Sequence, residues 1–109
     1  MKNYSTKWIT QRITAIILLP LTFWFTYSAV TLSEMGYNEI TIFFKSYTNL
    51  VLFYVMMISM LLHSKLGLQT IVDDYVTSKN GSKMIKSLIN FISYSLMSLI
   101  TFIILINKI

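Results

Sequence analysis

Three long stretches without a charged residue dominate this sequence. They run from Ile13 to Ser33, from Ser46 to Leu62 and from Ser87 to Asn107. The first and third reach about 20 residues, and a helix of that length crosses about 30 Å of hydrocarbon. Hydrophobic residues make up 55% of the chain and charged residues 12%, against roughly 25% charged in an ordinary soluble domain. We therefore expect an all-α integral membrane protein.

The expected transmembrane helices cover approximately residues 13–33, 46–76 and 87–107, and they form a single membrane-anchor domain over residues 1–109. The termini and the two loops are each only about a dozen residues long, well short of a soluble domain. We therefore assign no catalytic residue, and any enzymatic activity must use partner chains. Cysteine is absent, which excludes disulfides, thiolate zinc sites and iron–sulfur ligation within the chain.

The positive charges are unevenly distributed between the two sides of the membrane. Counting Lys and Arg outside the spans, the three-span topology places six on one side and two on the other: Lys2, Lys7, Arg12, Lys79, Lys83 and Lys86 against Lys45 and Lys108. The positive-inside rule therefore puts the N-terminus in the cytoplasm or matrix. It also accounts for the net charge of +5 without nucleic-acid binding. The first apolar run is long for a signal peptide and lacks a convincing cleavage site, so we expect it to be retained.

Two local features predict breaks in the helices. Pro20 lies inside the first span and leaves the Ile16 carbonyl without its usual donor, which predicts a kink. The segment Ser78–Ser82 reads Ser-Lys-Asn-Gly-Ser and is typical of a turn, so the second helix should end near Val76 or Thr77. From Ser46 to Tyr75 that helix would be about 45 Å long, and its last turns must leave the lipid.

The second span carries a polar stripe that includes the chain's only histidine. At 100° per residue, His63 and Asp74 lie within about 20° of the same direction. Other small or polar side chains follow the same spacing of three and four residues, and the stripe as a whole comprises Met56, Ser59, His63, Gly67, Thr70 and Asp74. Small residues allow close helix packing and polar ones avoid lipid. This face should therefore point into a multi-subunit helical bundle.

Two interpretations of His63 stay open at this point. It can hydrogen-bond a neighbouring helix within a packing interface, or it can ligate haem iron axially, with Gly67 making room for the macrocycle. A single histidine supplies one axial nitrogen, so a bis-histidine haem would need a second subunit. Arg12, at the same membrane level, either pairs with haem propionates or a quinone carbonyl or anchors the helix among headgroups.

The second helix ends with Asp73, Asp74 and Tyr75, although the helix dipole disfavours acidic residues there. A phenol donates one directional hydrogen bond, which suits a quinone carbonyl, and a neighbouring carboxylate can orient it or relay a proton. The alternative is a solvated polar helix terminus.

These residues together resemble a known family. His63, Gly67 and Asp74-Tyr75-Val76 form the pattern His-x3-Gly-x6-Asp-Tyr-Val, and Trp8-x2-Gln11-Arg12-x-Thr14-Ala15 opens the first helix. The chain resembles the small hydrophobic membrane anchor of succinate dehydrogenase (complex II), the D-type or cytochrome b small subunit. The resemblance implies that His63 is an axial ligand of haem b iron and that Arg12 lies near the propionates. It also implies that Tyr75 and Asp74 belong to the ubiquinone site.

The resemblance further implies a role in the tricarboxylic acid cycle and the respiratory chain. The expected partners are a second hydrophobic anchor of the cytochrome b large type, an iron–sulfur subunit and a flavoprotein subunit, with haem b shared between the anchors and ubiquinone as substrate. The expected location is a bacterial inner membrane or the mitochondrial inner membrane. Two alternatives remain: the anchor of a fumarate reductase, and a small membrane protein with a structural, assembly or pore-forming role and no cofactor.

Overall fold

The computed structural model describes residues 4–108, and all regular structure in this range is helical. The helices are α1 (Tyr4–Leu32), α2 (Tyr37–Lys45), α3 (Tyr47–Tyr75) and α4 (Lys79–Lys108). Three of them contain segments long and apolar enough to cross a membrane, over Ser5–Leu32, Tyr47–Tyr75 and Lys79–Asn107. The predicted class, an all-α membrane protein with three spanning helices, is confirmed.

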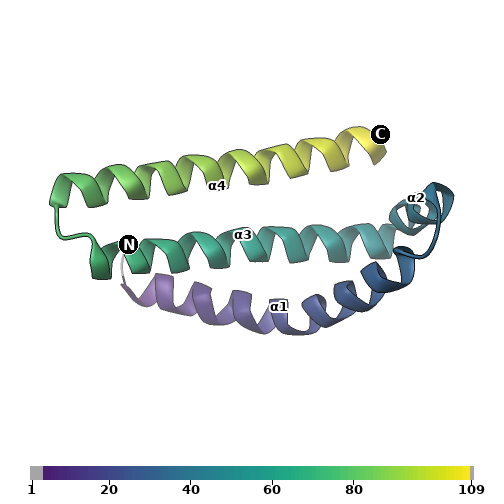
Figure 1. The fold of residues 1–109 in the computed structure, drawn as a ribbon, viewed down its shortest axis with the longest axis horizontal. Coiled ribbons are helices and arrows are strands. Elements are labelled where there is room, and N and C mark those ends of the chain that lie inside the picture. Colours follow the sequence, from purple (N-terminus) through teal and green to yellow (C-terminus); the bar gives the residue numbers. More distant parts are fainter. Residues whose placement is uncertain (1–3, 109) are drawn as a thin grey trace.

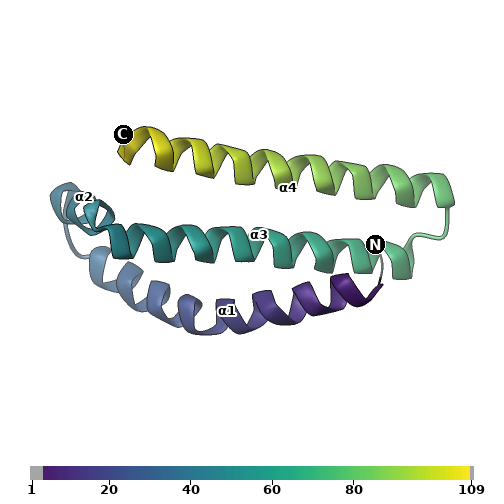
Figure 2. The same ribbon diagram turned by 180° about the vertical axis from the view of Figure 1, so that it is seen from behind.

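Helix α3 lies between α1 and α4, and both neighbours run antiparallel to it (Figures 1 and 2). It packs against α1, α4 and the short α2. The molecule is elongated, with extents of 51 × 26 × 23 Å. Helix α3 therefore takes part in two long helix interfaces, one with α1 and one with α4.

Most of the residues buried inside the described part of the molecule are polar, whereas large apolar side chains cover its outside. Lipid tails are as apolar as leucine, so spanning helices associate through close packing and polar contacts rather than through a hydrophobic core. The exposed apolar surface is therefore suited to lipid or to other membrane subunits. Among residues 5–107, the buried residues are Thr14, Ser28, Met56, Ser59, Leu66, Gln69, Val72 and Ser93.

Helix α1 continues through Pro20 and curves along its middle (Figure 1). Proline has no backbone N–H to bond the Ile16 carbonyl, and its ring crowds that carbonyl, so a helix bends at such a position. The bend follows the expectation from the sequence.

Helix α2 lies where the sequence predicted only a loop. Glu39 Oε1 accepts a hydrogen bond from the Gly36 backbone N–H at 3.0 Å, which satisfies one of the free donors at the helix start. The aromatic ring of Phe43 stacks on Trp24 with centroids 5.9 Å apart, and Phe44 meets Phe53 edge-on at 5.2 Å. These contacts with α1 and α3 stabilise a helix too short to form alone.

The second connection is shorter than the predicted turn over Ser78–Ser82. Helix α4 begins at Lys79, and only residues 76–78 link it to α3. Ser78 Oγ accepts a hydrogen bond from the Gly81 N–H at 3.1 Å, as an N-cap residue does. Asn80 and Gly81, which suggested a turn, are therefore tolerated in the first turn of a capped helix.

Candidate functional site

His63 lies on α3 and meets α1 through a single hydrogen bond. Its Nδ1 is 3.0 Å from the hydroxyl oxygen of Thr14. Thr14 is almost completely buried, with 4% of its surface exposed. The same hydroxyl is 2.8 Å from the Thr10 carbonyl oxygen and 3.1 Å from that of Gln11, both on its own helix. The histidine is thus held at the α1–α3 interface by a buried threonine.

The second ring nitrogen of His63 is not used within the described part of the chain. Among residues 4–108, the imidazole ring has one hydrogen-bond partner, Thr14, and it uses Nδ1 for that bond. Gln11 Oε1 is the buried side-chain atom without a partner in this range. Since Nε2 also lacks a partner but is not buried, it is reachable from outside the chain. A ligand could therefore approach Nε2 without displacing a bond.

Two features near Gly67, one turn further along α3, are not explained by contacts within the chain. A Cβ atom built on Gly67 would meet only Gln11 Nε2, at an ordinary contact distance of 3.8 Å. Packing within this chain therefore does not require a glycine here. The buried Gln11 Oε1 beside it has no hydrogen-bond partner among residues 4–108, and such an atom is costly unless something supplies a donor. The lack of any packing need for a glycine at position 67 fits a group brought in from outside the chain, whereas Oε1 is buried and becomes accessible only if the Gln11 side chain moves.

The polar stripe predicted on α3 divides into two parts. Met56 and Ser59 are buried, and His63, which bonds Thr14 of α1, is partly buried. Thr70 and Asp74 are exposed, further toward the end of α3. The stripe therefore leads from a helix interface to an open helix end.

The three polar residues at that end differ in their contacts. Asp73 pairs with Lys86 of α4 at 2.6 Å, with both side chains partly exposed. Asp74 and Tyr75 have no hydrogen-bond or ionic partner among residues 4–108, and Tyr75 is 80% exposed. The pairing with Lys86 explains how one acidic residue is accommodated at a helix C-terminus. The contact was missed from the sequence, although an acidic helix end followed by a basic segment was a usable signal.

Arg12 lies on a different face of α1 from the histidine contact. It precedes Thr14 by two residues and therefore points about 160° away around the helix. Its guanidinium group lies over the ring of Trp8, 5.1 Å from the centroid, and the residue is exposed. Within this chain, the structure does not bring Arg12 to His63.

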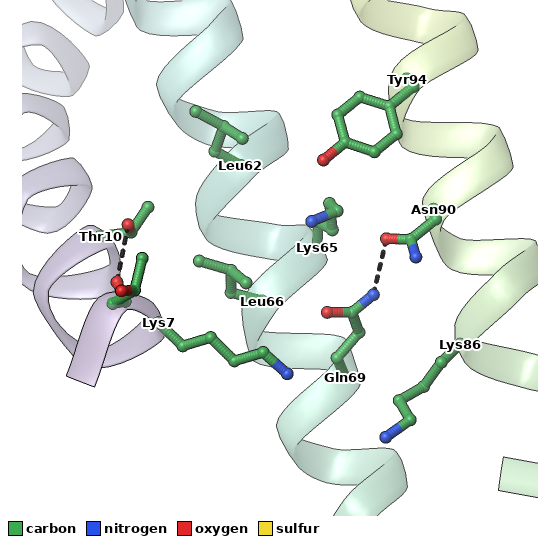
Figure 3. A pocket seen from close by; sticks show the side chains of 10 residues that line it. Lys7, Thr10, Leu62, Lys65, Leu66, Gln69, Lys86, Asn90 and Tyr94 are labelled. Atoms are coloured by element: carbon green, nitrogen blue, oxygen red, sulfur yellow. Dashed lines mark hydrogen bonds between the residues drawn. The ribbon is translucent and has the colours of Figure 1, made fainter. Parts of the chain in front are cut away.

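A cavity between α1, α3 and α4, into which several polar side chains reach, was not predicted from the sequence. It has a volume of about 740 Å³. Gln69 donates a hydrogen bond across it to Asn90 at 2.8 Å, and Lys65 lies 5.1 Å from the ring centre of Tyr94 (Figure 3). Lys7 reaches into the same space from α1 (Figure 3). Amide side chains within apolar spans were the signal, because a buried amide needs a partner.

Fold and site together define a small membrane protein with three helices long enough to span the bilayer. It offers one histidine nitrogen, without a partner among residues 4–108, as a candidate cofactor ligand. Among residues 4–108, no cluster of three or more His, Cys, Asp or Glu could hold a metal ion by itself. Residues 2–105 match the family described as the succinate dehydrogenase/fumarate reductase transmembrane subunit, and the chain belongs to this family.

Curated relatives of modest identity are named as succinate dehydrogenase subunits. A succinate dehydrogenase hydrophobic membrane anchor subunit from Rickettsia bellii is 31% identical over 104 residues, which cover 94% of this chain and 81% of that protein. The protein of the same name from Rickettsia prowazekii is 29% identical over 106 residues, covering 96% and 82%.

Proposed function

We propose that this chain is the hydrophobic anchor of a succinate dehydrogenase that passes electrons from succinate to ubiquinone. A second hydrophobic anchor, an iron–sulfur subunit and a flavoprotein subunit complete the complex. The flavoprotein oxidises succinate to fumarate, and the two electrons travel through the iron–sulfur clusters to the quinone. This chain contributes to binding sites and has no catalytic residue of its own. Its N-terminus lies on the cytoplasmic or matrix side.

His63 is the residue that would hold haem b in this chain, through Nε2. The single observation that supports this best is that Nδ1 is occupied by Thr14 while Nε2 is free and reachable. Gly67, one turn away, has no Cβ to crowd a flat macrocycle, and packing within the chain does not require a glycine there. Any further protein ligand to the haem would have to come from the partner anchor, because this chain has a single histidine. When bound, haem b supplies a one-electron redox centre between the two anchors.

Tyr75 and Asp74 would form this chain's part of the quinone site. Tyr75 ends α3 about 18 Å along the helix axis from His63, and its hydroxyl is free to donate a hydrogen bond to a quinone carbonyl oxygen. That bond strengthens as the oxygen gains charge during reduction. Asp74, adjacent and unpartnered among the described residues, can orient the phenol or hold a proton for the reduced quinone.

Arg12 would bind a negatively charged or carbonyl group at the face of α1 that points away from α3. Its guanidinium group faces away from Thr14, so a propionate or quinone group that it pairs with must approach the outer face of α1. The partner anchor would present that group. The contact with Trp8 keeps the guanidinium group near the helix surface until then.

Purification of the native complex tests this function. We expect flavin and iron–sulfur subunits to co-purify with the chain, a low-spin haem spectrum, and succinate-dependent reduction of ubiquinone. A chain that purifies without those partners and without haem would contradict the proposal and favour a structural or assembly role.

A fumarate reductase anchor is the second candidate, because the family description names both enzymes. The two differ in the direction of electron flow. Rates of succinate oxidation and fumarate reduction, measured on one preparation with quinones of high and low potential, separate them. Faster fumarate reduction with a low-potential quinol would favour the second candidate.

A further inference from the structure

We propose that Thr14 is a positioning residue for His63: it accepts the Nδ1 proton and so holds the ring with its Nε2 lone pair directed outward. The inference rests on the proposed function of His63 as haem ligand and assigns a role to a residue on the other helix. Thr14 would determine which imidazole nitrogen of His63 carries the proton and would fix the plane of the ring.

The short contacts of the Thr14 hydroxyl determine the position of its proton. Oγ1 lies 2.8 Å from the Thr10 carbonyl oxygen, and two oxygens at that distance repel unless a proton lies between them. A carbonyl has no proton, so the hydroxyl must donate to it. The single hydroxyl proton is then used, and the bond to His63 at 3.0 Å must run in the other direction, from Nδ1–H to Oγ1.

A neutral imidazole with its proton on Nδ1 has its lone pair on Nε2. That nitrogen is the one without a partner in the described chain. Histidines that ligate metals usually donate their other N–H to a fixed acceptor, which sets the tautomer and the ring orientation. Thr14 would provide such an acceptor, although as a neutral hydroxyl rather than a carboxylate.

The environment of Thr14 makes it a rigid acceptor. It is 4% exposed, it is β-branched and therefore restricted at χ1 in a helix, and its bond to the preceding turn holds the hydroxyl in place. With Thr14→Val, the Nδ1 proton loses its acceptor in an apolar interface. The ring must then turn or move its proton to Nε2, and the second change abolishes ligation.

The test uses the whole complex purified with Thr14→Val, Thr14→Ala, Thr14→Ser or Thr10→Val in this chain. Thr10 is the matched control, since it lies one turn away on α1 and bonds the Thr6 carbonyl at 2.9 Å without contacting His63. We expect Val and Ala at position 14 to weaken haem binding by about 10- to 100-fold. They should also shift the low-spin electron paramagnetic resonance signal and raise the reduction potential of the remaining haem, because the ligand donates less electron density. Ser should restore all three properties, and Thr10→Val should leave them unchanged.

His63→Ala distinguishes the role of His63 as haem ligand from the role of Thr14 in positioning it. If haem is bound without change in His63→Ala, the proposed ligand is wrong and the role of Thr14 fails with it. If His63→Ala loses the haem signal but Thr14→Val and Thr14→Ala match Thr10→Val, the ligand stands and the positioning role is wrong. Thr14→Ala covers the case in which valine prevents assembly, and a Ser variant as perturbed as Ala would also overturn the inference.

Discussion

Two regions of the molecule differ in whether their polar groups are paired: the α3–α4 interface on one side, and the α1–α3 interface together with the C-terminal end of α3 on the other. Toward α4, side chains form pairs across the interface: Tyr54 with Thr101 at 2.8 Å, Gln69 with Asn90 at 2.8 Å and Asp73 with Lys86 at 2.6 Å. On the α1 side, Thr14 bonds His63 Nδ1 at 3.0 Å. Other polar groups there and at the end of α3 have no partner among residues 4–108: His63 Nε2, Gln11 Oε1, Asp74 and Tyr75.

This difference separates structural from functional polarity in a membrane chain. A polar group that is paired within the molecule stabilises it and needs no further explanation. A polar group left without a partner is costly in an apolar environment unless another molecule supplies one. We therefore expect substitutions at the α3–α4 interface to affect stability, and substitutions at the unpaired groups to affect haem or quinone.

The largest effect is expected at Tyr75. Tyr75→Phe removes one oxygen from an exposed side chain and so should leave assembly intact. Loss of a hydrogen bond that strengthens during quinone reduction should cost about 1–3 kcal/mol, roughly a 5- to 150-fold lower rate of ubiquinone reduction. Steady-state kinetics with ubiquinone measure it, and succinate oxidation with an artificial acceptor that bypasses the quinone should be unchanged. A wild-type rate with ubiquinone, together with wild-type inhibitor binding, would make Tyr75 an interfacial anchor.

Gly67→Leu should weaken haem binding while preserving the fold. Overpacking at a filled site costs about 1–2 kcal/mol, which corresponds to roughly 5- to 30-fold weaker binding. The ratio of haem to flavin in the purified complex measures it. Ser64→Leu is the matched control, because it adds the same side chain to an exposed position of α3. Equal haem content in the two variants would show that Gly67 makes no room for a cofactor.

The Gln69–Asn90 pair should affect stability without affecting haem. Asn90→Leu leaves the buried Gln69 amide without its partner, at a cost of about 1–3 kcal/mol in the free energy of unfolding. The double variant Gln69→Leu/Asn90→Leu should recover part of that loss, because no buried amide is then left without a hydrogen-bond partner. Denaturation of the complex in detergent measures both. A haem spectrum altered by Asn90→Leu at full assembly would contradict the separation of the two regions.

The smallest effect is expected at Asp73 and Lys86. Both side chains are partly exposed, at 48% and 32%, and exposed ion pairs contribute only about 0–1 kcal/mol. Lys86→Gln should therefore lower stability by less than about 1 kcal/mol and leave quinone reduction unchanged. Asp74→Asn changes the neighbouring acid, which has no partner among residues 4–108, and should slow quinone reduction. The same activity in both variants would remove the distinction between the Asp73–Lys86 pair and the unpaired Asp74.

The sequence predicted the fold class and its three spans because charge-free stretches of that length have few alternatives. It also placed His63 and Asp74 on one face of α3, which follows from helix periodicity alone. It could not identify Thr14 as the partner of His63, because that contact depends on how α1 is rotated and shifted against α3. Helix α2 was missed although Gly36 and Glu39 form a start signal, since its stability depends on aromatic contacts with distant residues.

The haem spectrum of the complex carrying His63→Ala tests the central claim most directly. The claim is that the free nitrogen of His63 is a cofactor ligand, whereas the paired groups toward α4 are structural. It predicts loss or strong alteration of the low-spin haem absorbance and resonance signals in assembled complex, and unchanged signals in Gln69→Leu/Asn90→Leu. A wild-type bis-histidine spectrum in His63→Ala would contradict it.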